Sequence, residues 1–340
     1  MTSEREYFVD IWKGIGMTLV IIGHITSFMP LGTYIQSFHM PLFFFVSGYL
    51  FNSNKYLTFK SFINNKFWKL LFPYLFFYII TYLYWVIIEK QFRGNLGGAD
   101  SEWYKPIIGL IYGSEVNGTM IHNGVLWFIP CLFTTETLFY FIIQKVKTKI
   151  GIFFSILSFL IIGKLFILNN LTNFPWGISI SFVAIFIYGI GYISKNLVKH
   201  LKNIRLNNIF IIILTIILQY IVIPKNVFIV MMNSNYGNIL YFIIEAFAGT
   251  LLFMSISILI NRNSFLEYIG RNSILFLAFH QPIKRGIIYL LSKIIHIPLS
   301  EIRENIICTL IALSLTIIII IPIVYIYNKY FPKLLVYIQK

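Results

Sequence analysis

The sequence predicts an all-α membrane protein, a polytopic helical bundle with about ten transmembrane helices. Of its 340 residues, 58% are hydrophobic and only 11% are charged, and the mean hydropathy is +0.79. This composition is too apolar for a soluble domain. The apolar residues are grouped into runs of roughly 20, the length that an α-helix needs to cross the hydrocarbon core of a bilayer. The chain is therefore expected to use lipid as its solvent.

Ten apolar runs are the candidate spans, and the basic residues between them predict their orientation. The runs cover residues 9–29, 38–52, 70–89, 123–144, 150–168, 176–194, 208–224, 239–260, 272–291 and 305–328. An even number of spans places both termini on one side. Most of the 27 Lys and Arg residues fall on that side, and cytoplasmic loops carry such an excess. We therefore expect cytoplasmic termini and a single membrane-embedded domain over residues 1–340.

Neither the net charge nor the cysteines indicate a further function. The net charge is +15, but the basic residues lie in short loops between apolar runs, as in other membrane proteins. We therefore expect no nucleic-acid partner. Cys131 and Cys308 both lie in apolar runs, where two distant cysteines are more often packing residues than a disulfide.

The first apolar run carries three ionisable residues, Asp10, Lys13 and His24. Such groups cost roughly 2.5 to 3.5 kcal/mol each inside a bilayer, so they are expected to face the protein interior. In a helix, Lys13 and His24 fall on nearly the same face, about 16 Å apart along the axis. Asp10 lies three residues before Lys13, a spacing that favours an ion pair. A polar stripe is therefore predicted to cross the membrane.

Two more histidines lie towards the outer ends of other spans. His39 begins the second run, just before Pro41, and His280 precedes Pro282 in the ninth. One membrane histidine is more often a hydrogen-bonding core residue, but three at one side indicate a site. Three imidazoles can hold zinc; no tight His-x-x-x-His spacing supports this, and we expect no metal. The remaining histidines are in loops and are expected to be solvated: His122, His200 and His296.

Polar residues also mark the fourth run, which reads LWFIPCLFTTETLFY around Trp127 and Glu136. Glu136 is a carboxylate in the middle of the membrane, where desolvation favours the neutral form. A catalytic role and a structural hydrogen bond remain equally open for it. The loop over residues 90–122 holds Glu102 and Glu115 among aromatic residues, and it is either an interfacial loop or a cover over an outward-facing site.

Four motifs in order resemble the polytopic acyltransferase family 3 of membrane O-acetyltransferases, and more closely its fucose 4-O-acetylase-like branch. DIWKGIGMTLVIIGH is similar to the first-helix motif, with Lys13 in place of the usual arginine, eleven positions before His24. FHMPLFFFVSGYLF, with His39 and Ser47, resembles the second-helix motif. LWFIPCLFTTETLFY and RNSILFLAFHQPI resemble the later tryptophan and His-x-Pro motifs. The resemblance covers essentially the whole chain.

This resemblance implies transfer of an acetyl group from cytoplasmic acetyl-CoA to a hydroxyl of a cell-envelope or capsular sugar at the plasma membrane. The candidate catalytic residues are His24, His39, Glu136 and His280, and the candidate acetyl-CoA contacts are Lys13, Asp10, Ser47 and Trp127. Neutral imidazole is the ordinary base for activating a hydroxyl near pH 7, and His24 is the first choice. The donor to the oxyanion, and the choice between a ternary complex and an acyl-histidine relay, stay open.

Two other classes of membrane protein remain as alternatives. A transporter or flippase for lipid-linked sugars would also carry intramembrane charges, along its pathway. It would be favoured by discontinuous helices and inverted halves, which the sequence does not clearly show. A glycan polymerase is expected to have a large outer loop with more basic residues than residues 90–122 contain. Consumption of a thioester distinguishes the acyltransferase from both.

Overall fold

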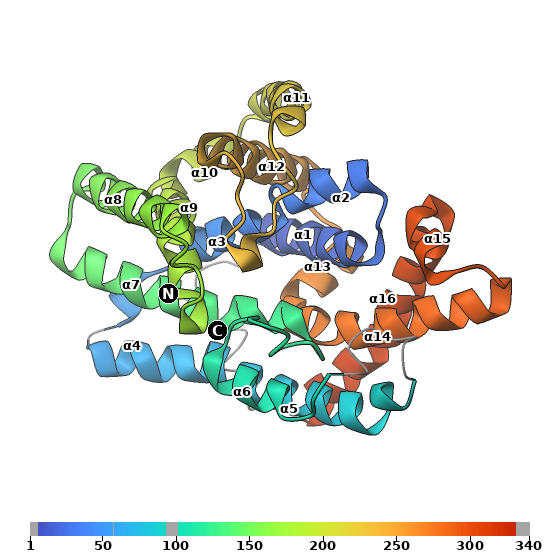
Figure 1. The fold of residues 1–340 in the computed structure, drawn as a ribbon. Helices are drawn as coiled ribbons and strands as arrows, with labels where there is room; N and C mark the ends of the chain where they lie inside the picture. Colours follow the sequence, from blue (N-terminus) through green and yellow to red (C-terminus); the bar gives the residue numbers. More distant parts are fainter. Residues whose placement is uncertain (1–5, 57, 93–100, 331–340) are drawn as a thin grey trace.

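The computed structural model describes residues 6–56, 58–92 and 101–330, and these residues form an all-α fold (Figure 1). Both chain termini, for which the sequence predicts the cytoplasmic side, lie outside the described residues. The helices are α1 (Tyr7–Ile25), α2 (Met29–Gln36), α3 (His39–Leu50), α4 (Phe59–Lys66), α5 (Phe72–Ile87), α6 (Lys105–Tyr112), α7 (Phe128–Lys145), α8 (Lys149–Leu168), α9 (Ile178–Ile193), α10 (Lys195–Leu201), α11 (Arg205–Val222), α12 (Ile239–Ile260), α13 (Ser264–Arg271), α14 (Ser273–Ile295), α15 (Leu299–Glu304) and α16 (Ile306–Tyr330).

Within this described part, nine helices are long and apolar enough to cross a membrane. They correspond to nine of the ten predicted runs. The remaining run, the second in the chain, was predicted over residues 38–52. It forms α3, which has only 12 residues and so rises about 18 Å. The third run begins earlier than predicted, at Phe59, because α4 continues through a π-helical turn, Phe67–Leu71, into α5. Lys60, Lys66 and Lys69, counted as loop residues in the sequence, therefore lie on this helix.

Helices α1 and α3 form an antiparallel hairpin at the centre of the bundle (Figure 1). At one end, the Tyr49 hydroxyl of α3 donates a hydrogen bond of 2.6 Å to the carboxylate of Glu6, just before α1. At the other end, the rings of His24 and His39 lie 6.4 Å apart. The hairpin therefore carries the two histidines of the first two motifs at the same end.

Glycines allow the central helices to approach each other closely. A Cβ atom at Gly48 of α3 would collide with the carbonyl group of Tyr188 in α9, and one at Gly191 would collide with the carbonyl group of Phe45. Gly14 likewise lets the backbone of α13 approach α1, at Leu266. Small residues at such crossings are typical of membrane helix packing. These contacts fix α3 and α13 against longer helices.

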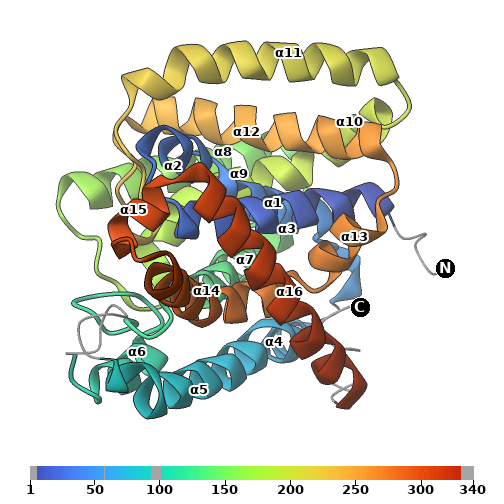
Figure 2. The same ribbon diagram turned by 90° about the vertical axis from the view of Figure 1, so that its right-hand side faces the viewer.

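The outer helices expose their apolar side chains. Helix α11 lies outside α12, which separates it from α1 (Figure 2). On α11, the apolar side chains of Leu206 and Phe210 are 77% and 66% exposed. Helix α8 has few buried residues as well. Side chains of this kind on outer helices are typical of surfaces that face lipid.

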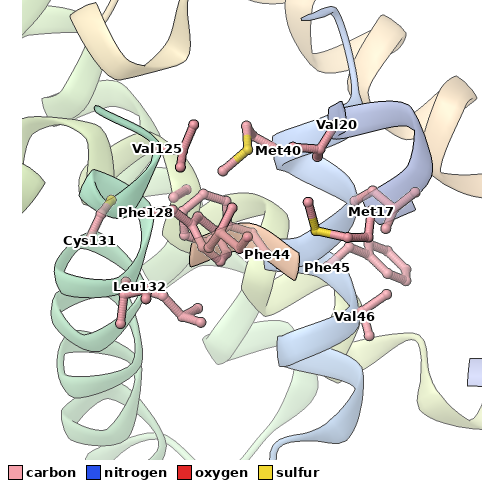
Figure 3. Packing of buried hydrophobic residues seen from close by; sticks show 14 of the residues in the cluster. Met17, Val20, Met40, Phe44, Phe45, Val46, Val125, Phe128, Cys131 and Leu132 are labelled. Atoms are coloured by element: carbon pink, nitrogen blue, oxygen red, sulfur yellow. The ribbon is translucent and has the colours of Figure 1, made fainter. Parts of the chain in front are cut away.

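Buried sulfur-containing, branched and aromatic side chains from α1, α3 and α7 pack together in the core (Figure 3). Met17 and Val20 come from α1, and the rings of Phe44 and Phe128 join α3 to α7 at a centroid distance of 5.0 Å. Cys131 lies in this cluster, and both cysteines are buried and free, as predicted. Val20, Met40 and Val125 of this cluster also line the cavity described next.

Candidate active site

The structure brings the three predicted histidines together from three helices. His24 lies in the last turn of α1, His39 begins α3, and His280 lies in the second turn of α14. The ring centroid of His24 is 5.3 Å from that of His280 and 6.4 Å from that of His39. His39 and His280 are buried, with 3% and 0% exposure. The sequence motifs, which are far apart in the chain, therefore contribute to one cluster.

Backbone carbonyl groups orient two of these imidazole rings. Nδ1 of His39 lies 2.9 Å from the carbonyl oxygen of Ile35, and Nδ1 of His280 lies 2.9 Å from that of Phe276. Because a carbonyl oxygen only accepts, each Nδ1 must carry the proton. In the neutral ring Nε2 then keeps its lone pair. For His280, Nε2 is buried and has no hydrogen-bond partner among the described residues.

A small cavity of about 150 Å³ lies beside the histidines. His24 and His39 line it together with Trp127 and the amide side chains of Gln36 and Gln281. The rest of the lining is apolar: Val20, Met40, Gly124, Val125, Phe228, Val230, Met231, Met232 and Leu277. A cavity of this size holds a group about as large as benzene. It suits an acetyl thioester, whereas a nucleotide is too large for it.

His24 is the histidine most open to this cavity. It is half-buried, and within residues 6–56, 58–92 and 101–330 its ring nitrogens make no hydrogen bond. His280 does not line the cavity, but its ring is next to that of His24. No carboxylate contacts any of the three rings in the described part of the chain, so the cluster differs from a Ser-His-Asp arrangement.

Two cations hold the end of α1 that carries His24. Lys284, one turn after His280 in α14, donates a hydrogen bond of 2.5 Å from Nζ to the carbonyl oxygen of His24. Arg303 donates from Nε to the carbonyl oxygen of Ile25 at 3.0 Å. Helix C-terminal carbonyl groups favour cations. The sequence gives one sign of Lys284, its spacing of four from His280, which places both residues on one face of α14.

The opposite end of α1 carries the other predicted polar residues. Lys13 Nζ lies 3.2 Å from the Asp10 carboxylate, which confirms the predicted pair. Arg271 at the end of α13 also reaches Asp10, with Nε 3.4 Å from Oδ2. Since α1 is continuous from Tyr7 to Ile25, Lys13 and His24 are separated by three turns of helix, as predicted. Lys13 does not line the histidine cavity.

Glu136 lies apart from the histidines, in an ion pair. Its Oε2 atom is 2.8 Å from Nζ of Lys66, and its Oε1 atom accepts a hydrogen bond from the Tyr188 hydroxyl at 3.3 Å. The Phe51 ring is near both, 6.0 Å from Tyr188 and 5.6 Å from Lys66 Nζ. Because Phe51 follows the last residue of α3, Glu136 is near the end of this helix opposite His39. The mid-membrane carboxylate therefore has a cation that the sequence did not reveal.

Ser47 and Trp127 occupy different positions relative to the site. Trp127 lines the cavity. Ser47 is a half-buried residue two turns after His39 in α3 and does not line it. Of the residues predicted to contact the acyl donor, Trp127 alone is thus next to the histidines.

His122 is fully buried, and the prediction that it is solvated is wrong. Its ring packs against Tyr78 at a centroid distance of 4.3 Å, and Arg285 donates to its carbonyl oxygen. Burial and the nearby Arg285 guanidinium lower the pKa of His122 to about 3, so this ring stays neutral. Arg285 is itself paired with Glu89 at 3.1 Å. His200 and His296 are exposed, as expected.

Asn123 is a further contributor that sequence reasoning missed. It is fully buried, and its side-chain amide donates to the carbonyl oxygen of Ala278 at 2.8 Å. This bond joins the segment before Trp127 to α14, two residues before His280. It therefore positions two walls of the site relative to each other.

The arrangement fits acid-base chemistry on a small neutral group. In residues 6–56, 58–92 and 101–330, no group of three His, Cys, Asp or Glu side chains is arranged to hold a metal ion. Imidazole nitrogens with free lone pairs can take a proton from a hydroxyl. Besides the histidines, the indole of Trp127 and the side-chain amides of Gln36 and Gln281 bring N–H donors to the lining. A base and donors at one cavity are the requirements of acyl transfer.

Comparison with known proteins identifies the family. A family described as acyltransferase domain matches residues 6–326, which is nearly the whole chain. A nodulation protein, NolL, of Mesorhizobium japonicum is 38% identical over 89 residues, covering 22% of this chain and 23% of that protein. The match thus spans about a quarter of the relative's length. No solved structure matches. The chain belongs to acyltransferase family 3 and is a multi-pass membrane acyltransferase.

Proposed function

We propose that this acyltransferase moves an acetyl group from acetyl-CoA to a hydroxyl of a sugar in a cell-envelope, capsular or exported polysaccharide. The family supports acyl transfer, and the partial likeness to a nodulation protein is compatible with a sugar acceptor. The excess of basic residues on one side supports an orientation in the plasma membrane with the acyl donor on the cytoplasmic side.

The half-buried ring of His24 on the small cavity is the observation that carries the proposal. A sugar hydroxyl is too weak an acid to attack a thioester unaided. His24 takes the hydroxyl proton while the oxygen attacks the thioester carbonyl. The tetrahedral intermediate then collapses, the C–S bond breaks, and the departing thiolate of coenzyme A takes the proton from the imidazolium. The products are the acetylated sugar and coenzyme A.

The hydrogen bonds of the histidines restrict which groups can stabilise the oxyanion. Neutral His39 uses its one N–H on the carbonyl oxygen of Ile35, so it presents a lone pair and no donor to the cavity. Trp127, Gln36 and Gln281 line the cavity and have N–H groups. We therefore assign the oxyanion donor to this set, and give His39 and His280 supporting roles beside His24. In an acyl-histidine relay, the same lone pair of His39 would attack the thioester carbonyl.

The phosphates of acetyl-CoA need a cationic site outside the histidine cavity. The cavity lining has no Lys or Arg residue and is too small for a nucleotide. Lys13 lies three turns away on α1, and both Lys13 and Arg271 of α13 are paired with Asp10. In this proposal they meet phosphate or pantetheine, and Asp10 orients both side chains. Lysine offers a point charge there and lacks the bidentate contact that an arginine can make with a phosphate.

The proposal is tested with purified protein in liposomes, radiolabelled acetyl-CoA and crude envelope glycans. The wild-type protein should transfer label to the glycan. His24→Ala should lower the transfer rate by at least ~10²-fold, the usual contribution of a general base, while acetyl-CoA still binds. His200→Ala, at an exposed histidine of α10, is the matched control and should transfer normally. Near-normal transfer by His24→Ala would remove His24 as the base.

A further inference from the structure

A second, larger cavity lies next to the histidine cavity. Its volume is about 280 Å³, close to the lower limit of small-molecule sites at roughly 300 Å³. Three separate loops form it. Ser114, Glu115 and Asn117 come from the loop after α6, Asn173 and Phe174 from the loop after α8, and Asn233 from the loop before α12.

Hydrogen bonds join two of these loops into a preformed surface. The Tyr112 hydroxyl donates to the carbonyl oxygen of Asn173 at 2.6 Å. The Trp176 indole donates to the carbonyl oxygen of Ile111 at 2.9 Å, and the amide of Gly177 donates to the Ser114 hydroxyl at 2.8 Å. Ligand sites are usually largely formed before the ligand arrives.

The lining has the chemistry of a site for a neutral polyhydroxyl compound. The side chains of Asn117, Asn173 and Asn233 are exposed and make no hydrogen bond within the described part of the chain. Each offers a paired donor and acceptor. The Glu115 carboxylate adds acceptors, and its Oε2 atom is held by the backbone amide of Met120. Phe174 supplies an aromatic surface.

The same lining argues against an anionic ligand. The chain has 27 Lys and Arg residues and a net charge of +15, yet none of the lining residues is basic and one is a carboxylate. Phosphate groups are normally met by Arg or Lys. The cavity is therefore unsuited to the nucleotide of acetyl-CoA, and the ligand it fits is uncharged.

Met232 connects this cavity to the histidines. It lines both cavities, and Asn233, the next residue, lines only the larger one. Met231 lies on the histidine side. A pair of backbone hydrogen bonds between Val230 and Asn235, at 2.9 and 3.1 Å, closes this segment into a turn. A ligand in the larger cavity is thus one side chain away from the cavity of His24.

We infer that the cavity lined by Asn117, Asn173 and Asn233 binds the neutral sugar unit of the acceptor. This inference rests on the proposed function. The asparagine amides and Glu115 bond the ring hydroxyls, Phe174 packs against a ring face, and Met232 separates the sugar from the thioester. The hydroxyl that projects past Met232 is the one that becomes acetylated.

The test compares the double variant Asn173→Ala/Asn233→Ala with a matched double variant. The control is Asn203→Ala/Asn207→Ala, which removes two exposed amides from elsewhere in the chain. With the full-length protein in liposomes, the first variant should raise the KM for crude envelope glycan about tenfold, as expected for two lost hydrogen bonds. The KM for acetyl-CoA should not change. An unchanged KM for glycan, or an equal rise in the KM for acetyl-CoA, would overturn the inference.

Direct binding separates this inference from the proposed function. The probes are methyl glycosides of neutral hexoses and 6-deoxyhexoses, detected by saturation-transfer NMR without acetyl-CoA. If wild-type protein transfers no label to glycan, the proposed function fails on its own. Glycoside signals that are present in the wild type and lost in Asn173→Ala/Asn233→Ala would still support the cavity as a sugar site. Glycoside signals that are absent from the wild type, or equal in the wild type and the variant, would overturn the sugar site.

Discussion

The imidazole rings of His24 and His280 lie 5.3 Å apart, although they come from the first membrane helix and from one near the other end of the chain. The same helix α14 also touches the backbone of His24, because Lys284 donates to its carbonyl oxygen. His24 is thus held by α14 at its ring and at its main chain. The position of the proposed base therefore depends on α14, which has its own motif in the sequence.

Lys284→Met should slow acetyl transfer about tenfold, equivalent to roughly 1.4 kcal/mol in the barrier. The substitution keeps the length of the side chain and removes the ammonium group from the His24 carbonyl oxygen, so the end of α1 loses a positioning contact. Affinity for acetyl-CoA should be retained. Steady-state transfer kinetics together with a direct acetyl-CoA titration measure both quantities.

Lys293→Met is the control for this prediction, since Lys293 is an exposed residue of the same helix. Its transfer rate should equal that of the wild type. If Lys284→Met also transfers at the wild-type rate, the ammonium group does not position His24.

Lys13→Met should weaken acetyl-CoA binding about tenfold and leave the rate at saturation nearly unchanged. A charged hydrogen bond contributes roughly 1.5 to 3 kcal/mol, and a loss of binding that is equal in the ground and transition states raises KM alone. Lys13→Arg should keep most of the affinity. Titration with acetyl-CoA, with Lys60→Met at an exposed residue as control, gives the dissociation constants. A fall in the saturated rate with unchanged affinity would contradict a donor-binding role.

Glu136→Ala should destabilise the protein by about 3 to 5 kcal/mol, because it leaves the buried Lys66 ammonium without its carboxylate. The double variant Lys66→Met/Glu136→Met removes both charges and should recover stability and acetyl transfer. Thermal unfolding in detergent and label transfer measure the two properties. A stable double variant without transfer activity would instead give Glu136 a chemical role.

Much of the site follows from the sequence because its residues lie in helices. Helix periodicity places Lys13 and His24 on one stripe, and α1 is a continuous helix as expected. The short hairpin then brings His39 back to His24. The predicted run over residues 272–291 includes Lys284, but a position within one helix does not reveal that its ammonium group reaches the carbonyl oxygen of His24 in another.

The remaining features depend on contacts between distant segments. Lys66 was assigned to a loop because it is charged, but Glu136 from another helix compensates its charge inside the bundle. His122 was assigned to solvent, yet Tyr78 covers it. The larger cavity combines three loops, and sequence spacing does not reveal how loops from different helices meet.

Chemical rescue of His24→Gly is the most direct test of the central claim, that a neutral imidazole at this position accepts the proton of the sugar hydroxyl. The variant removes the ring that lines the cavity and leaves space for a small molecule. Acetyl transfer should fall by at least ~10²-fold and should rise again in proportion to added neutral imidazole. Transfer that stays at the low level at every imidazole concentration, or that never falls in the variant, would contradict the claim.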